Sequence, residues 1–184
     1  MYDWRVNLWQ ILKASLALAV TTLAASAGVI AQTPDIHYVP TPDAVVSAML
    51  DLAGVTAADV VYDLGSGDGR IVIEAARKYG ARAVGIELDP ELNKKAARNA
   101  EKAGVAGKVT FVRADFFKTD LSDASVVTLF LSPNINARLQ PKFRRELEPG
   151  TRIVSHRFPM PPDWKPDRDL KVKGTHVFLW TIRS

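Results

Sequence analysis

Acidic side chains and glycines recur in the first half of the chain with a spacing that could bind a nucleoside. Asp63 stands before a turn, and Glu87 ends the apolar run that follows it. Between them glycine occupies alternate positions of the turn, Gly65, Gly67 and Gly69. Such glycines let a ligand approach the backbone and the N-terminus of the next helix, and an acidic strand end can accept hydrogen bonds from the hydroxyls of a ribose. The pattern therefore predicts a site for a cofactor that contains a nucleoside.

The charges around this turn distinguish between cofactors. The dinucleotide fingerprint G-x-G-x-x-G cradles a pyrophosphate, whereas the turn here reads G-x-G-x-G, with Arg70 where the third glycine of the fingerprint would stand. Asp63 before the turn and Asp68 within it would repel a pyrophosphate. The same carboxylates would favour the ammonium and sulfonium groups of S-adenosylmethionine, which has a ribose and no phosphate. We therefore expect S-adenosylmethionine as the cofactor, and a dehydrogenase is the weakest alternative.

Alternating strands and helices are needed to position these residues. Apolar runs at 60–64, 83–86, 109–112, 125–131 and 152–156 predict strands, and 170–173 with 176–182 predict a hairpin. Helical patterns lie at 42–53 and 90–103, and further helices begin near 70 and 134. The order predicts an α/β fold with a Rossmann-like, doubly wound, mostly parallel seven-stranded sheet and a C-terminal antiparallel hairpin. Four prolines between 158 and 169 predict an extended loop there instead of a helix.

These motifs resemble those of known methyltransferases. Asp63-Leu-Gly-Ser-Gly-Asp-Gly69, followed by the acidic Glu87, resembles the first two motifs of the class I, seven-strand methyltransferases. Tyr38-Val-Pro-Thr-Pro42, Leu131-Ser-Pro-Asn134 and Pro149-Gly-Thr-Arg-Ile-Val-Ser-His156 are similar to a narrower family within that class. It includes the protein-lysine methyltransferases that act on the c-ring protein of the mitochondrial ATP synthase and on the ADP/ATP carrier, with bacterial relatives. The resemblance implies S-adenosylmethionine-dependent methylation of lysine side chains in a protein substrate, with a membrane protein as one option.

The resemblance also assigns residues to the cofactor site. It implies that Asp115 accepts a hydrogen bond from the adenine amino group and that its apolar neighbour Phe116 packs on the ring; the alternative for Asp115 is a turn residue. In class I methyltransferases a helix before the first strand lies beside the pocket, so Tyr38 and Thr41 would line it, or Thr41 only caps this helix. The predicted cofactor-binding set is Tyr38, Thr41, Asp63, Gly65, Ser66, Gly67, Gly69, Glu87, Leu88, Asp115, Phe116 and Leu131.

Two residues that follow or end later strands are candidates for the transfer step, Asn134 and His156. Ligands of open α/β sheets bind at the carboxyl ends of the strands, so both residues should face the acceptor. A lysine with a pKa of about 10.4 must lose a proton before it can accept a methyl group. We expect Asn134 to orient the amine through its side-chain oxygen. His156 is either a proton acceptor or a structural residue at the strand end.

The composition indicates one globular domain and excludes several reaction classes. A chain of 184 residues with 47% hydrophobic residues can bury a core. The absence of cysteine excludes disulfides, thiolate metal sites and the cysteine nucleophile used to methylate C5 of a pyrimidine. The three histidines lack metal-ligand spacing, so no metal is expected. The helix after Asn134 is expected to point its cationic side chains outward, Arg138, Lys142, Arg144 and Arg145.

Other functions remain as alternatives. Nucleic-acid adenine methyltransferases and glutamine methyltransferases usually carry Asn/Asp-Pro-Pro-Tyr/Phe after the fourth strand, whereas this chain has Leu131-Ser-Pro-Asn134, so no nucleic-acid partner is expected. A methyltransferase for small molecules normally has a large lid, for which the chain has little room. From another class, the chain would be a non-catalytic, cofactor-binding interaction module. The sequence predicts no oligomeric state.

The N-terminal segment differs from the rest of the chain. Residues 14–34 carry no charge, Arg5 and Lys13 precede the apolar run, and Ala25-Ser-Ala27 is typical of a signal cleavage site. The run is also close to the ~20 residues that span a bilayer. We therefore expect 1–33 to be a signal peptide or membrane anchor with a linker, and 34–184 to be the methyltransferase domain. The protein would be membrane-associated or exported. The charges before the apolar run favour a domain outside the cytoplasm, whereas S-adenosylmethionine is made inside cells. The side of the membrane on which the domain lies therefore stays open.

Overall fold

The computed structural model describes residues 39–184, in which a hydrophobic core lies on each face of one sheet. The predicted signal peptide or anchor at 1–33 and the predicted pocket residue Tyr38 lie outside the described residues. Within 39–184, no helix combines the length and the apolar character that crossing a bilayer requires.

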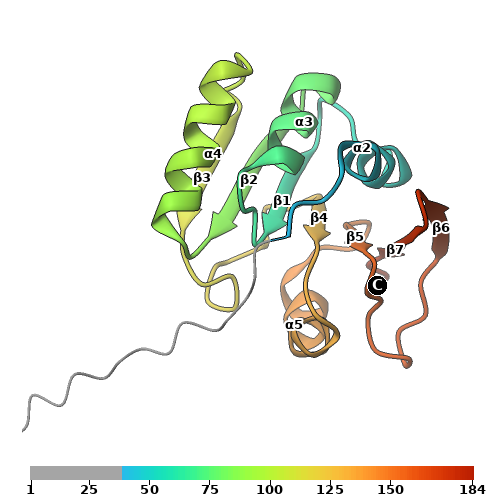
Figure 1. Ribbon diagram of the computed structural model, residues 1–184. Helices are drawn as coiled ribbons and strands as arrows, with labels where there is room; N and C mark the ends of the chain where they lie inside the picture. Colours follow the sequence, from blue (N-terminus) through green and yellow to red (C-terminus); the bar gives the residue numbers. More distant parts are fainter. Residues whose placement is uncertain (1–38) are drawn as a thin grey trace, which may run out of the picture. The chain divides into compact units, whose positions relative to one another are not determined.

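The sheet has seven strands in the order β3-β2-β1-β4-β5-β7-β6 (Figure 1). The strands are β1 (Val60–Leu64), β2 (Arg82–Glu87), β3 (Val109–Arg113), β4 (Val126–Leu129), β5 (Arg152–His156), β6 (Arg168–Val172) and β7 (Thr175–Thr181). The first five are parallel, and β7 is antiparallel to both β5 and β6. The predicted fold, a mostly parallel sheet closed by a C-terminal antiparallel hairpin, is confirmed.

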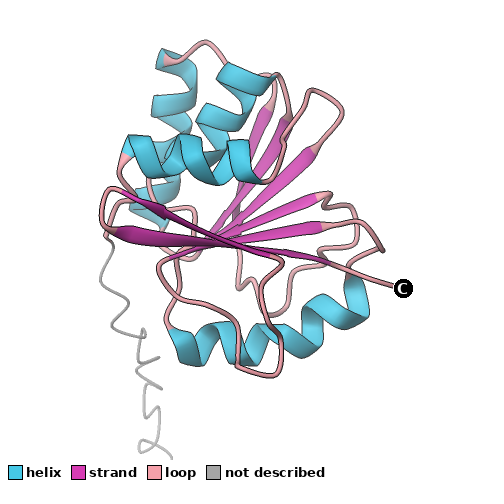
Figure 2. Ribbon diagram, turned by 90° about the vertical axis from the view of Figure 1, so that its right-hand side faces the viewer, coloured by secondary structure: helices cyan, strands magenta, loops and turns pink. Residues whose placement is uncertain are grey.

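Helices cover both faces of this sheet, but unequally (Figure 2). The helices are α2 (Asp43–Leu52), α3 (Arg70–Tyr79), α4 (Pro90–Lys102) and α5 (Pro133–Glu146). The first three lie on one face and α5 lies on the other (Figure 1). Local sequence sets their ends: Gly80 ends α3 with a left-handed φ of 74°, and the Asp89 side chain caps α4 by accepting hydrogen bonds from Glu91 N and Leu92 N.

Two loops complete the second face beside α5. The loop between β3 and β4 buries Phe116 and Leu121, and the loop between β5 and β6 buries Met160. Trp180 Nε1 donates a hydrogen bond to Trp164 O at 2.8 Å, which ties the second loop to β7. The predicted extended loop in the proline-rich stretch is therefore confirmed, and α5 shares this face of the sheet with two loops.

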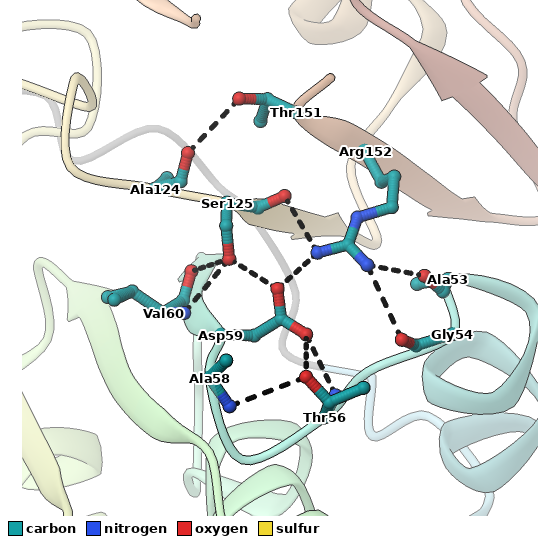
Figure 3. A network of polar contacts seen from close by, with 10 residues as sticks. All are labelled: Ala53, Gly54, Thr56, Ala58, Asp59, Val60, Ala124, Ser125, Thr151 and Arg152. Atoms are coloured by element: carbon teal, nitrogen blue, oxygen red, sulfur yellow. Dashed lines mark hydrogen bonds and ion pairs between the residues drawn. The ribbon is translucent and has the colours of Figure 1, made fainter.

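A polar network joins the amino ends of three central strands (Figure 3). Asp59, just before β1, accepts hydrogen bonds from Ser125 Oγ at 2.7 Å and from Thr56 N at 2.8 Å. Its carboxylate also forms an ion pair with Arg152 at the start of β5. Arg152 donates to Ala53 O at 3.0 Å, after the end of α2. The network fixes the edge of the sheet opposite to the carboxyl ends of the parallel strands.

Candidate functional site

The turn between β1 and α3 depends on its glycines. Gly65, Gly67 and Gly69 have φ angles of 78°, 53° and 81°, in the left-handed region that other residues rarely adopt. Gly65 N donates to Ile86 O at 2.9 Å, which holds the turn against β2. A Cβ on Gly69 would lie 2.7 Å from the ring of Phe111 on β3. The predicted glycine turn is therefore present, and two neighbouring strands fix it in place.

Glu87 lies across this turn at the end of β2. Its Oε2 accepts a hydrogen bond from Gly67 N at 3.0 Å, and its Oε1 accepts one from Asp89 N at 3.0 Å. An ionised carboxylate has about four acceptor positions, so one position on each oxygen remains for the two hydroxyls of a ribose. The half-buried carboxylate thus fits the role that the sequence predicted for it.

Asp63 is a buried carboxyl group directly beneath the turn. It is 3% exposed, and its Oδ1 accepts a hydrogen bond from Thr128 Oγ1 at 2.7 Å. Burial raises the pKa of Asp63 to about 7, the Thr128 hydrogen bond opposes the rise, and the charges of Glu87 and Asp68 add to it. A cationic ligand close by would favour the ionised form. The group therefore fits the ammonium or sulfonium of S-adenosylmethionine.

Thr128 did not appear among the predicted site residues. The parallel register of β1 and β4 places it opposite Asp63. A signal was present, because Thr128 is a polar residue inside a strand whose four residues are all buried.

Asp68 is engaged within the protein. Its Oδ1 and Oδ2 accept hydrogen bonds from Arg70 Nε and Nη2 at 3.0 and 2.9 Å. Arg70 Nη1 also donates to Thr41 O at 2.9 Å. The prediction treated Asp68 as a negative charge toward the ligand, but Arg70 compensates that charge. Sequence reasoning missed that Arg70 ties the glycine turn to the chain before α2.

Thr41 and His156 meet beside this connection. Thr41 is 4% exposed and its Oγ1 lies 3.3 Å from His156 Nδ1. The N-cap of α2 is Pro42, without a side-chain cap, so the capping alternative for Thr41 is wrong. His156 packs on Phe130 with ring centroids 4.0 Å apart. Burial, and then the charge of Arg157, lower the pKa of His156 to about 4, so the imidazole is neutral near pH 7.

The end of β4 brings two further predicted residues to the site. Leu131 is buried, and its Cδ2 lies 3.3 Å from the position of a Cβ on Gly65. Asn134 is exposed in the first turn of α5, after the N-cap Ser132. The two predicted catalytic residues therefore differ in access, because Asn134 is open to solvent whereas His156 is buried.

The remaining predicted cofactor residues lie near the ends of β1, β2 and β3. Asp115 Oδ1 accepts a hydrogen bond from Phe117 N at 2.9 Å, which gives it a turn role, and its Oδ2 is not used in that bond. Phe116 is buried, and Leu88 is 50% exposed. Ser66 is buried, and its Oγ points toward Gly85 of β2 without a hydrogen-bond partner among the described residues. Their contacts with a cofactor remain predictions.

Comparisons with known proteins agree with this geometry. Residues 63–168 match the family model of the ANTKMT methyltransferase domain. A protein-lysine N-methyltransferase of Saccharolobus islandicus is 47% identical over 154 residues, which are 81% of this chain and 95% of the relative. The adenine nucleotide translocase lysine N-methyltransferase of Mus musculus is 46% identical over 107 residues, 58% of this chain and 46% of the relative, so the chain spans about half the length of that protein.

A solved structure is also similar over most of the chain. The RNA methyltransferase from Salinibacter ruber, in complex with S-adenosyl-L-homocysteine, is 56% identical with a TM-score of 0.77. The match covers 79% of this chain and 94% of that one. S-adenosyl-L-homocysteine is S-adenosylmethionine without its transferable methyl group. The names of these relatives all describe methyltransferases and differ in the acceptor.

Proposed function

Because this chain belongs to the ANTKMT methyltransferase family, we propose that it methylates the side-chain amine of lysine residues in a protein. It is an S-adenosylmethionine-dependent methyltransferase. Bound S-adenosylmethionine supplies an activated methyl group on a sulfonium. The residues of the chain must then bind the cofactor, orient the amine and exclude water.

The observation that carries the lysine acceptor is an aromatic rim next to the glycine turn. We define this rim as Phe130, His156 and Phe158; the centroids of Phe130 and Phe158 lie 6.4 Å apart. The rim is joined to the turn through Thr41, which contacts both His156 and Arg70. Aromatic faces attract an ammonium group, and an apolar surface lowers the pKa of an amine that it desolvates. The neutral imidazole of His156 does not repel the ammonium group.

The low pKa of His156 favours its structural alternative over a proton acceptor. A base with a pKa of about 4 cannot take a proton from an ammonium with a pKa of about 10.4 to any useful extent. The proton therefore leaves to solvent before transfer, which costs about 4–5 kcal/mol at pH 7. Asn134 Oδ1 then orients the lone pair of the neutral amine toward the methyl group, because transfer depends on alignment.

The class of acceptor is tested by identifying the molecule that carries the transferred methyl label. The full chain is incubated with S-adenosylmethionine labelled in the methyl group, together with total protein and total RNA. Label that survives ribonuclease, is released by protease and is recovered as methyl-lysine after hydrolysis is the expected result. Label that ribonuclease removes would instead assign an RNA acceptor.

We also propose that the acceptor protein is bound to a membrane. The support is the apolar sequence at 14–34, which would bring the enzyme to a bilayer surface. In the same experiment, methyl-lysine should be enriched in protein extracted from membranes.

A further inference from the structure

Three side chains at the start of α5 divide into an exposed and a buried face. Asn134 and Arg138 are exposed and stand four residues apart, so they share one face of the helix. Asn136, between them, is fully buried and its Nδ2 donates to Phe158 O at 3.0 Å and to Pro159 O at 3.3 Å. The same helix thus presents the proposed amine-orienting residue and holds the loop that follows β5.

Arg138 is positioned by an aromatic ring from another loop. Its guanidinium carbon lies 4.2 Å from the ring centroid of Phe117, in the loop after β3. A guanidinium stacked in this way keeps its N–H groups directed outward in one plane, where they match both oxygens of a carboxylate. Arg138 has no acidic partner within residues 39–184.

Arg157 lies in a strained turn after β5. Its φ of 68° is in the left-handed region, and Phe158 N donates to His156 O at 2.8 Å across it. This three-residue turn is rare because it is strained. Two hydrogen bonds to Phe158 O hold it, one from Asn136 and one from Ser155 Oγ at 2.6 Å. Backbone strain that is retained next to a functional site commonly holds a side chain in a required position.

The strained turn presents a second stacked arginine. The guanidinium carbon of Arg157 lies 5.3 Å from the centroid of Phe158, a member of the aromatic rim. Arg157 is exposed and, like Arg138, forms no ion pair with a described acidic residue. Some other arginines of the domain have such partners, for example Arg77 with Glu74 and Arg183 with Asp167, whereas Arg144 also stacks on a ring, that of Trp164, without one among the described residues.

The two arginines contact loops that follow different strands: Arg138 of α5 stacks on Phe117 in the loop after β3, and Arg157 itself follows β5. The loops after β3, β4 and β5 leave the same edge of the parallel sheet, and β4 lies between the other two. We propose that Arg138 and Arg157 bind carboxylates of the acceptor protein around the lysine that Asn134 orients, so that the enzyme selects lysines in acidic surroundings. This inference rests on the proposed lysine acceptor and adds the surroundings of that lysine.

The test uses two peptides and three variants of the full chain. A lysine site mapped by mass spectrometry in total protein is synthesised with its natural flanks and with every flanking Asp and Glu changed to Asn and Gln. The variants are Arg138→Gln, Arg157→Gly and, as control, Arg98→Gln, an exposed arginine on α4. Glycine at 157 tolerates the left-handed φ, so this variant removes the charge without disturbing the turn.

The ratio of kcat/KM for the acidic peptide to that for the neutral peptide is the readout. Wild type and Arg98→Gln should prefer the acidic peptide, and Arg138→Gln and Arg157→Gly should each reduce the preference by about tenfold, the size expected for one lost charge-assisted hydrogen bond. An unchanged ratio in both variants, or mapped lysines without acidic neighbours, would overturn the inference and leave the lysine acceptor intact. Methyl-lysine absent from every protein, or label in RNA alone, would overturn the proposed function itself.

Discussion

At the scale of the residue, we expect Asp63 to couple cofactor binding to protonation. The carboxyl group is 3% exposed, and burial raises its pKa to about 7. The unfolded chain has an ordinary aspartate, so the folded protein binds this proton more tightly than the unfolded one. The contribution of Asp63 to stability is therefore fully present below the ordinary pKa of about 3.9 and is lost as the pH rises through 7.

The affinity for S-adenosylmethionine should consequently depend on pH. A cationic ligand prefers ionised Asp63, so affinity should fall by up to tenfold for each pH unit below about 7 and level off above it. Calorimetric titration between pH 5.5 and 8.5 measures this. Asp63→Asn should bind weakly with a flat profile, and an equally steep profile in that variant would assign the pH dependence to another group.

Asn134 is expected to act on transfer and not on cofactor binding. It is exposed at the start of α5, so Asn134→Ala should fold normally and bind S-adenosylmethionine as wild type does. Loss of the orienting oxygen should reduce kcat on the order of 100-fold, as misplacement of a reacting group does. Loss of cofactor binding in this variant would contradict the assignment.

At the scale of the element, the turn between β1 and α3 requires both a left-handed backbone and space for close packing at Gly69. A comparison with Gly104, which follows α4, separates these two requirements. Gly69 and Gly104 both have left-handed φ angles, 81° and 71°. A Cβ would meet Phe111 at 2.7 Å at the first and nothing within 4 Å at the second. Conformational and steric requirements can therefore be measured independently.

Alanine at the two positions should give different losses of stability. Gly104→Ala should reduce the free energy of unfolding by about 1–2 kcal/mol, the cost of the left-handed region for a residue with a Cβ. Gly69→Ala should lose more, because Phe111 must move, and should also weaken cofactor binding. Denaturant unfolding compares the two, and equal losses would show that Phe111 moves aside freely.

The polar network at the opposite edge should stabilise the arrangement of the strands. Burial acts to raise the pKa of Asp59, but hydrogen bonds from Ser125 and Thr56 and the charge of Arg152 outweigh it and lower the pKa. The stability that Asp59 contributes is thus present above the ordinary pKa of about 3.9 and is lost as the pH falls through the lowered value.

Arg152→Met should test this network. Arg152 keeps 25% of its side chain exposed, and removal of one partner of a mostly buried pair reduces stability by roughly 3 kcal/mol. The difference from wild type in denaturant unfolding should be large at pH 7 and should shrink at pH 3. A difference that persists in acid would attribute the loss to the packing of the arginine stem.

At the scale of the whole molecule, three helices cover one face of the sheet and α5 with two loops covers the other (Figure 2). The glycine turn between β1 and α3 lies at the carboxyl ends of the parallel strands, where the rule for open sheets expects a ligand. The stabilising network lies at their amino ends. The stabilising network and the glycine turn therefore lie at opposite edges of the sheet.

Membrane association should reside in the N-terminal segment alone. Residues 39–184 form a compact unit with a core on each face of its sheet, so a chain that begins at residue 34 should bind S-adenosylmethionine as the full chain does. In flotation with lipid vesicles, the full chain should move with the lipid and the shortened chain should not. Flotation of both would place the membrane contact in the domain.

The sequence by itself determined the cofactor turn, the order of strands and helices, the closing hairpin and the proline-rich loop. These features are local, because a left-handed glycine, a capping aspartate or an apolar run acts within a few residues. It also placed Glu87 beside the turn, since β1, the turn, α3 and β2 form one connected unit in which both strands end at the same edge.

Only the tertiary structure decided which distant side chains meet. Thr128 reaches Asp63, and Thr41 reaches His156, across 65 and 115 residues of sequence. Lys142 was expected to point outward but is 7% exposed, and Glu146 accepts a hydrogen bond from its Nζ at 2.5 Å. Burial and pKa depend on how strands and helices pack together, which no single segment encodes. The protonation states of Asp63 and His156 therefore belong to the fold as a whole.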